Sequence, residues 1–224
     1  MTTGARYDGI ADWYDAEFQP APLESEAWEV LNRLLGEPGG SLLDVGCGTG
    51  SYSAGLAERG WDVTGVDVSE DMLRRAGARG VRTVQADAAA LPFEDASFDA
   101  TVSVFTNTDV DDLGAVVREI ARVLRFGAPL VYLAVHPCFV GPHSVYDVDR
   151  KAPELHPGWY RRTGRYDEAP GIWRASGVRK RVGASHLPLA LFLQTFVDAG
   201  LSLERVEEPD QREYPFGLAF RWRR

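Results

Sequence analysis

Short apolar runs alternate along the chain with longer segments in which apolar residues recur every three or four positions. Runs of four to eight apolar residues are typical of buried strands, and the longer period is typical of amphipathic helices. Their alternation from about residue 24 onward predicts a doubly wound α/β fold with a mostly parallel sheet. The predicted strands are residues 41–45, 62–66, 81–85, 98–104 and 129–135, and the predicted helices lie near residues 24–35, 51–59, 70–77 and 112–124.

After residue 136 this pattern breaks, and residues 137–177 combine prolines and aromatic residues with no clear period. A loop of this length is usually functional or disordered. Its aromatic residues favour a folded segment, so we interpret residues 137–183 as an insertion that covers a binding site. Regular patterns then return. They predict a strand at residues 178–182, a helix at about 188–199, a strand at 201–207 and a final strand at 216–222.

Three glycines at alternate positions, Gly46, Gly48 and Gly50, follow the first predicted strand. A Cβ at such positions would block close approach of the backbone to a ligand, and the helix that follows presents free amide groups at its N-terminus. Asp67 ends the next predicted strand, roughly 20 residues later, where a carboxylate suits two vicinal ribose hydroxyls. The segment predicts a nucleoside-like ligand.

The spacing of the glycines separates two classes of nucleoside ligand. The dinucleotide fingerprint requires Gly or Ala three residues after its second glycine, but this chain has Ser51 there. A nicotinamide-dependent dehydrogenase is therefore the weakest alternative. Residues 44–50, together with Asp67 and the residues after it, resemble the class I S-adenosylmethionine-dependent methyltransferases, and the resemblance extends from about Tyr7 to the C-terminus.

This resemblance implies a Rossmann-like, seven-stranded sheet with an antiparallel last strand, and a single methyltransferase domain over residues 1–224 with a helical N-terminal lid at residues 1–23. It implies S-adenosylmethionine as cofactor and S-adenosylhomocysteine as product. The metal ligands of catechol-type methyltransferases have no counterpart here, so we expect no metal to be required.

The resemblance also assigns roles to individual residues. Asp87 would accept a hydrogen bond from the adenine amino group, and the Ala88 amide would donate one to the ring. Asp44 would either orient the glycine loop or reach the cofactor's ammonium group, and Met72 would either lie on the adenine or belong to the core. The full set expected to contact the cofactor is Tyr14, Asp44, Gly46, Cys47, Gly48, Gly50, Asp67, Val68, Met72, Asp87, Ala88, Phe105 and Thr106.

Methyl transfer from an activated cofactor needs alignment, exclusion of water and, for a hydroxyl acceptor, a base poised near neutral pH. Histidine is the natural base. His136 directly follows the fifth predicted strand, and His186 precedes a late helix. Both are candidate catalytic residues, with a structural role as the alternative for each.

Aromatic residues of the insertion are candidates for the acceptor site. Trp159, Tyr160 and Trp173 would either form walls for a flat or apolar acceptor or only hold the insertion in place.

Composition narrows the possible partners. A chain of 224 residues fits one α/β domain. Its net charge of −9 and pI of about 5.0 argue against binding to duplex nucleic acid. We expect no membrane segment, because no apolar run approaches about 20 residues. Two cysteines give no disulfide framework and favour the cytoplasm.

The resulting hypothesis is methyl transfer to a small molecule, with oxygen as the expected acceptor atom in secondary metabolism. Transfer to nitrogen or carbon stays open, as does a homodimer. Two further alternatives keep the fold and the cofactor site, since fold and function are separable. One is a non-methylating enzyme such as a cyclase, and the other is a cofactor-binding partner subunit.

Overall fold

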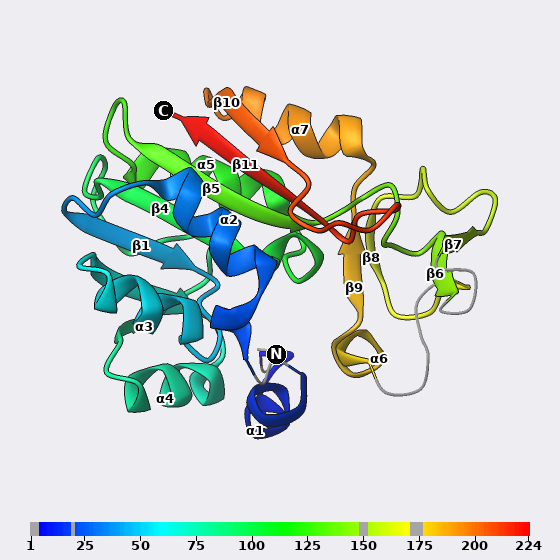
Figure 1. The fold of residues 1–224 in the computed structure, drawn as a ribbon, viewed down its shortest axis with the longest axis horizontal. Helices are drawn as coiled ribbons and strands as arrows, with labels where there is room; N and C mark the ends of the chain where they lie inside the picture. Colours follow the sequence, from blue (N-terminus) through cyan, green and yellow to red (C-terminus); the bar gives the residue numbers. More distant parts are fainter. Residues whose placement is uncertain (1–4, 19–20, 148–151, 171–176) are drawn as a thin grey trace.

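The computed structural model describes residues 5–18, 21–147, 152–170 and 177–224. At its centre lies a seven-stranded sheet with the strand order β10-β11-β5-β4-β1-β2-β3 (Figure 1). Its strands are β1 (Ser41–Val45), β2 (Asp62–Asp67), β3 (Arg82–Gln85), β4 (Ala100–Val104), β5 (Pro129–Val135), β10 (Ser202–Glu207) and β11 (Gly217–Arg223). β11 runs antiparallel to both of its neighbours, while β1 to β5 pair in parallel. The predicted Rossmann-like α/β fold with an antiparallel last strand is confirmed.

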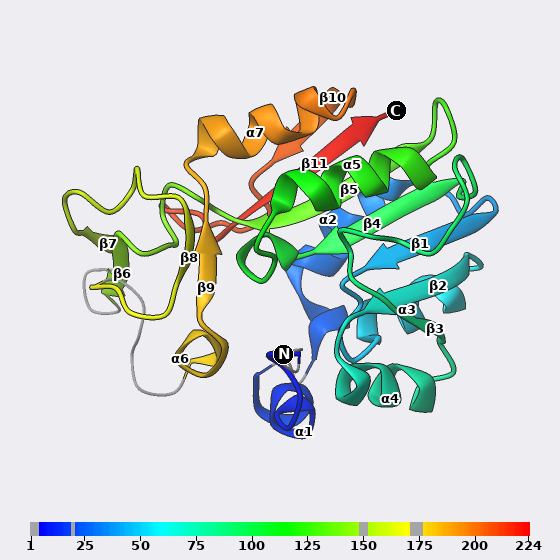
Figure 2. The same cartoon turned by 180° about the vertical axis from the view of Figure 1, so that it is seen from behind.

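Helices cover both faces of this sheet. On one face lie α2 (Glu26–Leu35) and α3 (Ser51–Glu58), whose apolar residues share a core cluster with β1, β4 and β5. The other face carries α5 (Leu113–Val123) and α7 (Leu189–Asp198), which come to the front when the molecule is turned around (Figure 2). Strands buried on both faces lack polar alternation, which explains the continuous apolar runs in the sequence.

Side-chain caps fix where several helices begin. Ser25 accepts a hydrogen bond from an amide in the first turn of α2, and Ser69 does the same for α4 (Glu70–Ala78). Asp112 caps α5 in the same way. Each cap satisfies an amide that has no partner inside its helix, so the helices start close to where the sequence predicts.

The insertion after β5 folds into small elements. β6 (Ser144–Asp147) pairs antiparallel with β7 (Ala152–Leu155), and β8 (Gly164–Tyr166) pairs antiparallel with β9 (Ala184–His186). The strand predicted at residues 178–182 is wrong, because this segment is the helix α6 (Val178–Val182). Val178 and Val182, its two buried residues, are four positions apart and so lie on one face of a helix.

The N-terminal segment contains α1 (Ala11–Trp13), the π-helical turn η1 (Tyr14–Phe18) and the 3-10 turn η2 (Pro22–Glu24). Residues 5–18, which we call the lid, lie beside α4 and near α6 (Figures 1 and 2). Polar contacts join the lid to α4: the Gly9 amide donates to Asp71 at 2.6 Å, and Arg75 donates to Asp12 at 2.8 Å. None of the described helices is long and apolar enough to span a bilayer.

Candidate functional site

The loop between β1 and α3 depends on its three glycines. Gly46, Gly48 and Gly50 have φ angles of 73°, 54° and 78°, a region that L-residues rarely adopt. A Cβ on Gly46 would lie 2.4 Å from the Thr106 methyl group, and one on Gly50 would lie 2.6 Å from the Cβ of Ala76. A Cβ on Gly48 would meet no atom within 4 Å. Close packing therefore fixes the two outer glycines, while the middle of the loop faces open space that a ligand can occupy.

Asp67, at the C-terminal end of β2, holds this loop in place. Its Oδ2 accepts a hydrogen bond from the Gly48 amide and its Oδ1 accepts one from the Ser69 amide, both at 2.9 Å. Burial raises the pKa of Asp67, and these amides act against that shift. Each carboxylate oxygen can accept more than one hydrogen bond. Asp67 can therefore still receive two hydroxyl groups of a ligand at the edge of the loop.

Asp44, near the end of β1, is only 2 % exposed. Its carboxylate accepts a hydrogen bond of 2.5 Å from the hydroxyl of Ser53, which joins β1 to α3. Burial raises the pKa of Asp44 to about 6, the Ser53 hydroxyl lowers it, and the charge of Asp67 raises it further. This hydrogen bond is consistent with the expectation that Asp44 orients the glycine loop, which lies between β1 and α3. Its expected contact with the cofactor stays a prediction.

Several residues expected on the adenine side border the ends of β2 and β3. Val68 is 54 % exposed, whereas Met72 is buried in α4. Asp87 is exposed, and its carboxylate accepts a hydrogen bond from the Ala89 amide at 2.9 Å. The adjacent Ala88 is partly exposed. Their contacts with adenine remain predictions.

Cys47 lies inside the glycine loop and is buried. Burial raises the pKa of its thiol well above the usual value, and the charges of Asp44 and Asp67 act in the same direction. The thiol is therefore neutral and unreactive, so Cys47 serves the loop as a small buried side chain.

After β4 the chain turns through Phe105, with a φ of 58°, into the short 3-10 helix η3 (Thr106–Thr108). The Thr106 hydroxyl is hydrogen-bonded within the sheet, at 2.7 Å from Ser103 and 2.8 Å from the hydroxyl of Tyr132. Its methyl group is directed toward Gly46. Thr106 thus packs against the glycine loop, and Phe105 lies next to it.

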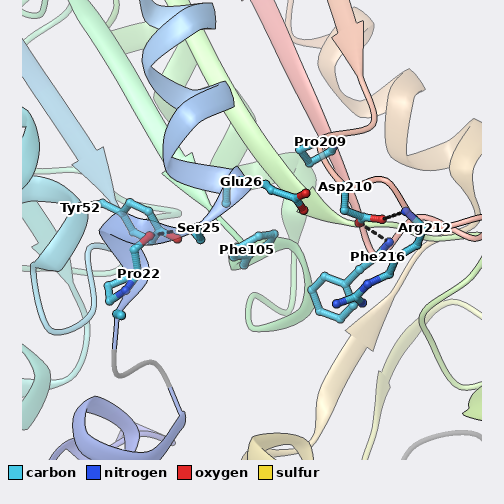
Figure 3. A pocket seen from close by; sticks show the side chains of 12 residues that line it. Pro22, Ser25, Glu26, Tyr52, Phe105, Pro209, Asp210, Arg212 and Phe216 are labelled. Atoms are coloured by element: carbon cyan, nitrogen blue, oxygen red, sulfur yellow. Dashed lines mark hydrogen bonds between the residues drawn. The ribbon is translucent and has the colours of Figure 1, made fainter. Parts of the chain in front are cut away.

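Phe105 also lines a cavity of about 380 Å³ (Figure 3). Its aromatic walls are Tyr52, Phe105 and Phe216, and residues 21–27 and 209–217 complete it. Asp210 shapes the last segment by accepting hydrogen bonds from the amides of Arg212 and Phe216. Phe105 is the sequence-predicted residue in this cavity. Sequence reasoning missed its other walls, because they come from both ends of the chain and share no local pattern.

The two candidate histidines are held by other groups. The Nδ1 of His136 accepts a hydrogen bond from the Cys138 amide at 3.1 Å, and its Nε2 lies 3.5 Å from Glu208. Burial lowers the pKa of His136, and Glu208 opposes the shift. His186 is 5 % exposed and donates from Nε2 to the Tyr160 carbonyl at 2.8 Å. Burial lowers the pKa of His186 to about 4. These contacts favour a structural role for His186, and catalysis by either ring stays a prediction.

Trp159 and Tyr160 of the insertion do not line the cavity of Figure 3. The Tyr160 hydroxyl accepts a hydrogen bond from the Leu189 amide at 3.1 Å, which anchors the insertion at the start of α7. Trp159 stacks under the guanidinium of Arg162, 3.9 Å from the ring centre, and lines a second cavity of about 510 Å³. Trp173 lies outside the described residues. The acceptor contacts expected of these three aromatic residues remain predictions.

Tyr14 of the lid is partly buried beside Tyr7 and near the charge of Asp109. Its ring meets that of Tyr7 edge-on, with centres 5.6 Å apart. Burial raises the pKa of Tyr14, and Asp109 adds to the shift. Asp109 follows η3 and contacts both Tyr7 and Arg179. The position of Asp109 after β4, at the edge where α/β sheets bind ligands, could have identified it, whereas Arg179 is one of several basic residues of the insertion and the sequence does not distinguish it from the others.

Comparison with known proteins finds similarity to methyltransferases. Residues 43–132 match a family described as "Methyltransferase domain". The malonyl-[acyl-carrier protein] O-methyltransferase of Pseudescherichia vulneris is 32% identical over 158 residues, which cover 69% of this chain and 57% of that protein. The demethylmenaquinone methyltransferase of Renibacterium salmoninarum is 33% identical over 148 residues, covering 63% of this chain and 62% of that protein. The chain therefore spans about three fifths of the length of these two relatives.

One solved structure that resembles this chain is also a methyltransferase. An S-adenosylmethionine-dependent methyltransferase from Mesorhizobium loti superposes with a TM-score of 0.74 at 26% identity, covering 89% of this chain and 98% of that one.

Proposed function

Because the chain belongs to the class I S-adenosylmethionine-dependent methyltransferases, we propose that it transfers the methyl group of that cofactor to an oxygen atom of a small molecule. The cofactor is proposed to lie over the C-terminal ends of β1 and β2. It supplies an activated methyl group on a positively charged sulfonium, so the protein's tasks are to bind, align and exclude water.

The observation that supports this proposal most directly is the junction of Asp67 with the glycine loop. The Asp67 carboxylate is fixed by the Gly48 amide at 2.9 Å, and Gly48 borders open space. A partly buried acceptor of hydrogen bonds beside an unobstructed stretch of backbone fits a ribose diol on one side and the methionine part of the cofactor on the other.

The acceptor is proposed to enter the cavity of Figure 3. Phe105 lines this cavity, and its neighbour Thr106 touches the glycine loop at Gly46. The aromatic walls Tyr52, Phe105 and Phe216 favour a flat, largely apolar acceptor, because ring faces bury apolar area well. The name of the Pseudescherichia vulneris relative supports oxygen as the acceptor atom.

Isothermal calorimetry with S-adenosylhomocysteine tests the cofactor site. We expect the wild-type protein to bind it and the Asp67→Ala variant to bind at least about tenfold more weakly, since hydrogen bonds to a charged group contribute about 1.5–3 kcal/mol. The Asp62→Asn variant is the matched control, because Asp62 lies at the far end of the same strand and pairs with Arg82 at 2.9 Å. Equal affinity of the Asp67→Ala and wild-type proteins would contradict the proposed site, and preferential binding of NAD would revive the dehydrogenase alternative.

Methyl transfer itself is tested by incubating the protein with methyl-labelled cofactor and a panel of phenols, carboxylic acids, amines and carbon nucleophiles. Label on a hydroxyl or carboxyl oxygen supports the proposal, and label on nitrogen or carbon corrects the acceptor atom. A product that forms without any S-adenosylhomocysteine would instead show a non-methylating reaction such as a cyclisation.

A further inference from the structure

Asp109 is the point where three separate parts of the chain meet. It belongs to the segment after β4, and its carboxylate accepts a hydrogen bond of 2.8 Å from the hydroxyl of Tyr7 in the lid. The guanidinium of Arg179, from α6 of the insertion, pairs with the same carboxylate oxygen. Arg6 of the lid donates to the Asp109 carbonyl at 2.7 Å. One residue therefore joins the lid and the insertion to the end of β4.

These contacts are partly shielded from water, since the side chains of Arg179 and Asp109 are 20% and 24% exposed. Burial raises the pKa of Tyr7 well above its usual value, and the Asp109 charge adds to that shift. Burial disfavours the charge on Arg179, but Asp109 and the tyrosines beside it more than offset this effect, so the pKa of Arg179 lies above its usual value. Removing one partner of such a partly buried ion pair leaves the other charge uncompensated and so weakens the contact. The Arg6–Asp111 pair nearby is different, because the Asp111 side chain is 65% exposed.

A second contact joins the lid to the insertion directly. The guanidinium of Arg181 lies over the ring of Trp13, 4.1 Å from its centre. Arg179 and Arg181 both belong to α6. One contacts Asp109, to which the lid is hydrogen-bonded, and the other contacts the lid itself. The third cation of the helix, Lys180, is exposed and offers a control at the same place in the fold.

The Asp109 contacts connect to the glycine loop through one short path. The Asp109 amide donates to the Thr106 carbonyl at 2.8 Å, and the methyl group of Thr106 packs against Gly46. The lid also reaches the far side of the cofactor site, since Asp8 accepts a hydrogen bond of 2.6 Å from Ser69, whose amide donates to Asp67. The lid therefore bridges the groups proposed to hold the two ends of the cofactor.

We propose that Asp109 and Arg179 are positioning residues that hold the lid and the insertion closed over the cofactor site, so that release of S-adenosylhomocysteine requires their contact to break. This inference rests on the proposed function for the identity of the ligand. Loop or lid opening limits turnover in many enzymes that close over their substrates. Here the closing contact is polar and can reform after each release.

The test compares Arg179→Met, Arg179→Lys and Lys180→Met in the full chain. The first measurement is the dissociation rate of S-adenosylhomocysteine. It is monitored by stopped-flow tryptophan fluorescence after the complex is mixed with excess labelled S-adenosylmethionine. We expect Arg179→Met to release the ligand roughly tenfold faster, since a partly buried carboxylate is left without its cation. Arg179→Lys should recover part of the loss because it restores the charge but not the planar fork. Lys180→Met should behave as wild type.

The second measurement is amide hydrogen exchange without ligand. Residues 5–18 should exchange faster in Arg179→Met than in Lys180→Met, while β1 and β4 keep their protection. Tyr7→Phe serves as a milder variant should Arg179→Met fold poorly, because it removes one hydrogen bond to Asp109 and leaves the ion pair. It should change both measurements in the same direction by a smaller factor.

Equal dissociation rates in Arg179→Met and Lys180→Met would overturn the inference, as would equal exchange of residues 5–18. Faster exchange throughout β1 and β4 would also overturn it, because the effect would then be a general loss of stability. A wild-type protein that binds no S-adenosylhomocysteine would refute the proposed function instead, and hydrogen exchange would still decide whether Arg179 fixes the lid.

Discussion

Replacing Asp44 with asparagine should stabilise the ligand-free protein at neutral pH. Asp44 is 2 % exposed, and one hydroxyl, that of Ser53, hydrogen-bonds its carboxylate. An asparagine oxygen can accept the same hydrogen bond. The Asp44→Asn variant therefore keeps the contact between β1 and α3 but removes a buried charge.

The magnitude follows from the pKa of Asp44, which burial raises from 3.8 to about 6. Between these two values the native state binds more protons at Asp44 than the unfolded state does, so the free energy of unfolding falls as the pH rises from about 4 to about 6. Above that window the cost of the charge reaches about 3 kcal/mol, at about 1.4 kcal/mol per unit of pKa. The new amide group must find a partner, which costs about 1 kcal/mol. We therefore expect the Asp44→Asn variant to be about 2 kcal/mol more stable than wild type at pH 8.

Urea denaturation of both proteins at several pH values between 4.5 and 8 measures this difference. Because the other titrating groups are common to both chains, their effects cancel. The stability advantage of the variant should grow as the pH rises to about 6 and stay constant above it. Asp62→Asn, at the exposed start of β2, is the control and should change the stability by less than about 1 kcal/mol. A difference that does not vary with pH, or a more stable wild type at pH 8, would refute the reasoning.

Three other substitutions have expected outcomes that urea denaturation can measure. Gly50→Ala should destabilise the protein by roughly 2–4 kcal/mol, because φ is 78° and the new Cβ would lie 2.6 Å from a neighbouring carbon; a loss below 0.5 kcal/mol would contradict this. The pKa of His186 falls from 6.5 to about 4 on folding, so its contribution is present above pH 6.5 and lost as the pH falls toward 4. His186→Gln should remove up to about 3 kcal/mol of the change in the free energy of unfolding between pH 4 and pH 6.5. An unchanged dependence of that free energy on pH would argue against this contribution of His186. Phe196→Ala should cost about 3–5 kcal/mol because the ring is fully buried, whereas Val197→Ala on the exposed side of α7 should cost less than about 0.5 kcal/mol. Similar losses in the two would exclude a specific packing effect.

The features that the sequence predicts well are local ones. Strands buried on both faces produce unbroken apolar runs, so β1, β2 and β5 begin at the residues expected. The glycine loop is local as well, because positive φ angles favour glycine at all three positions and close packing adds to this at Gly46 and Gly50. The sheet order and the antiparallel last strand come instead from the family resemblance, since periodicity does not distinguish one strand order from another.

The features that the sequence leaves open depend on distant contacts. Residues 178–182 contain too few apolar positions to separate a strand from one helical turn, and the contacts of Val178 and Val182 decide the outcome. Arg179 meets Asp109 from 70 residues away. The cavity walls likewise combine residues 21–27 with residues 209–217. No periodicity within a window of ten or twenty residues contains such pairings.

Under the proposed function, the acidic groups around the site would bind the charged cofactor more tightly than the uncharged product. Asp44 and Asp67 lie at the ends of adjacent strands, and burial raises the pKa of both, so each charge carries a desolvation cost. A bound cation offsets part of that cost and a neutral ligand does not. In the proposed complex the two carboxylates would therefore favour the sulfonium form of the cofactor over the uncharged thioether that remains after transfer. Attraction to the ground-state charge does not accelerate methyl transfer, because that charge disperses in the transition state. In the proposed reaction its benefit would fall on the last step, because the product lacks this attraction, and breaking of the Asp109–Arg179 contact would then open the path by which the product leaves.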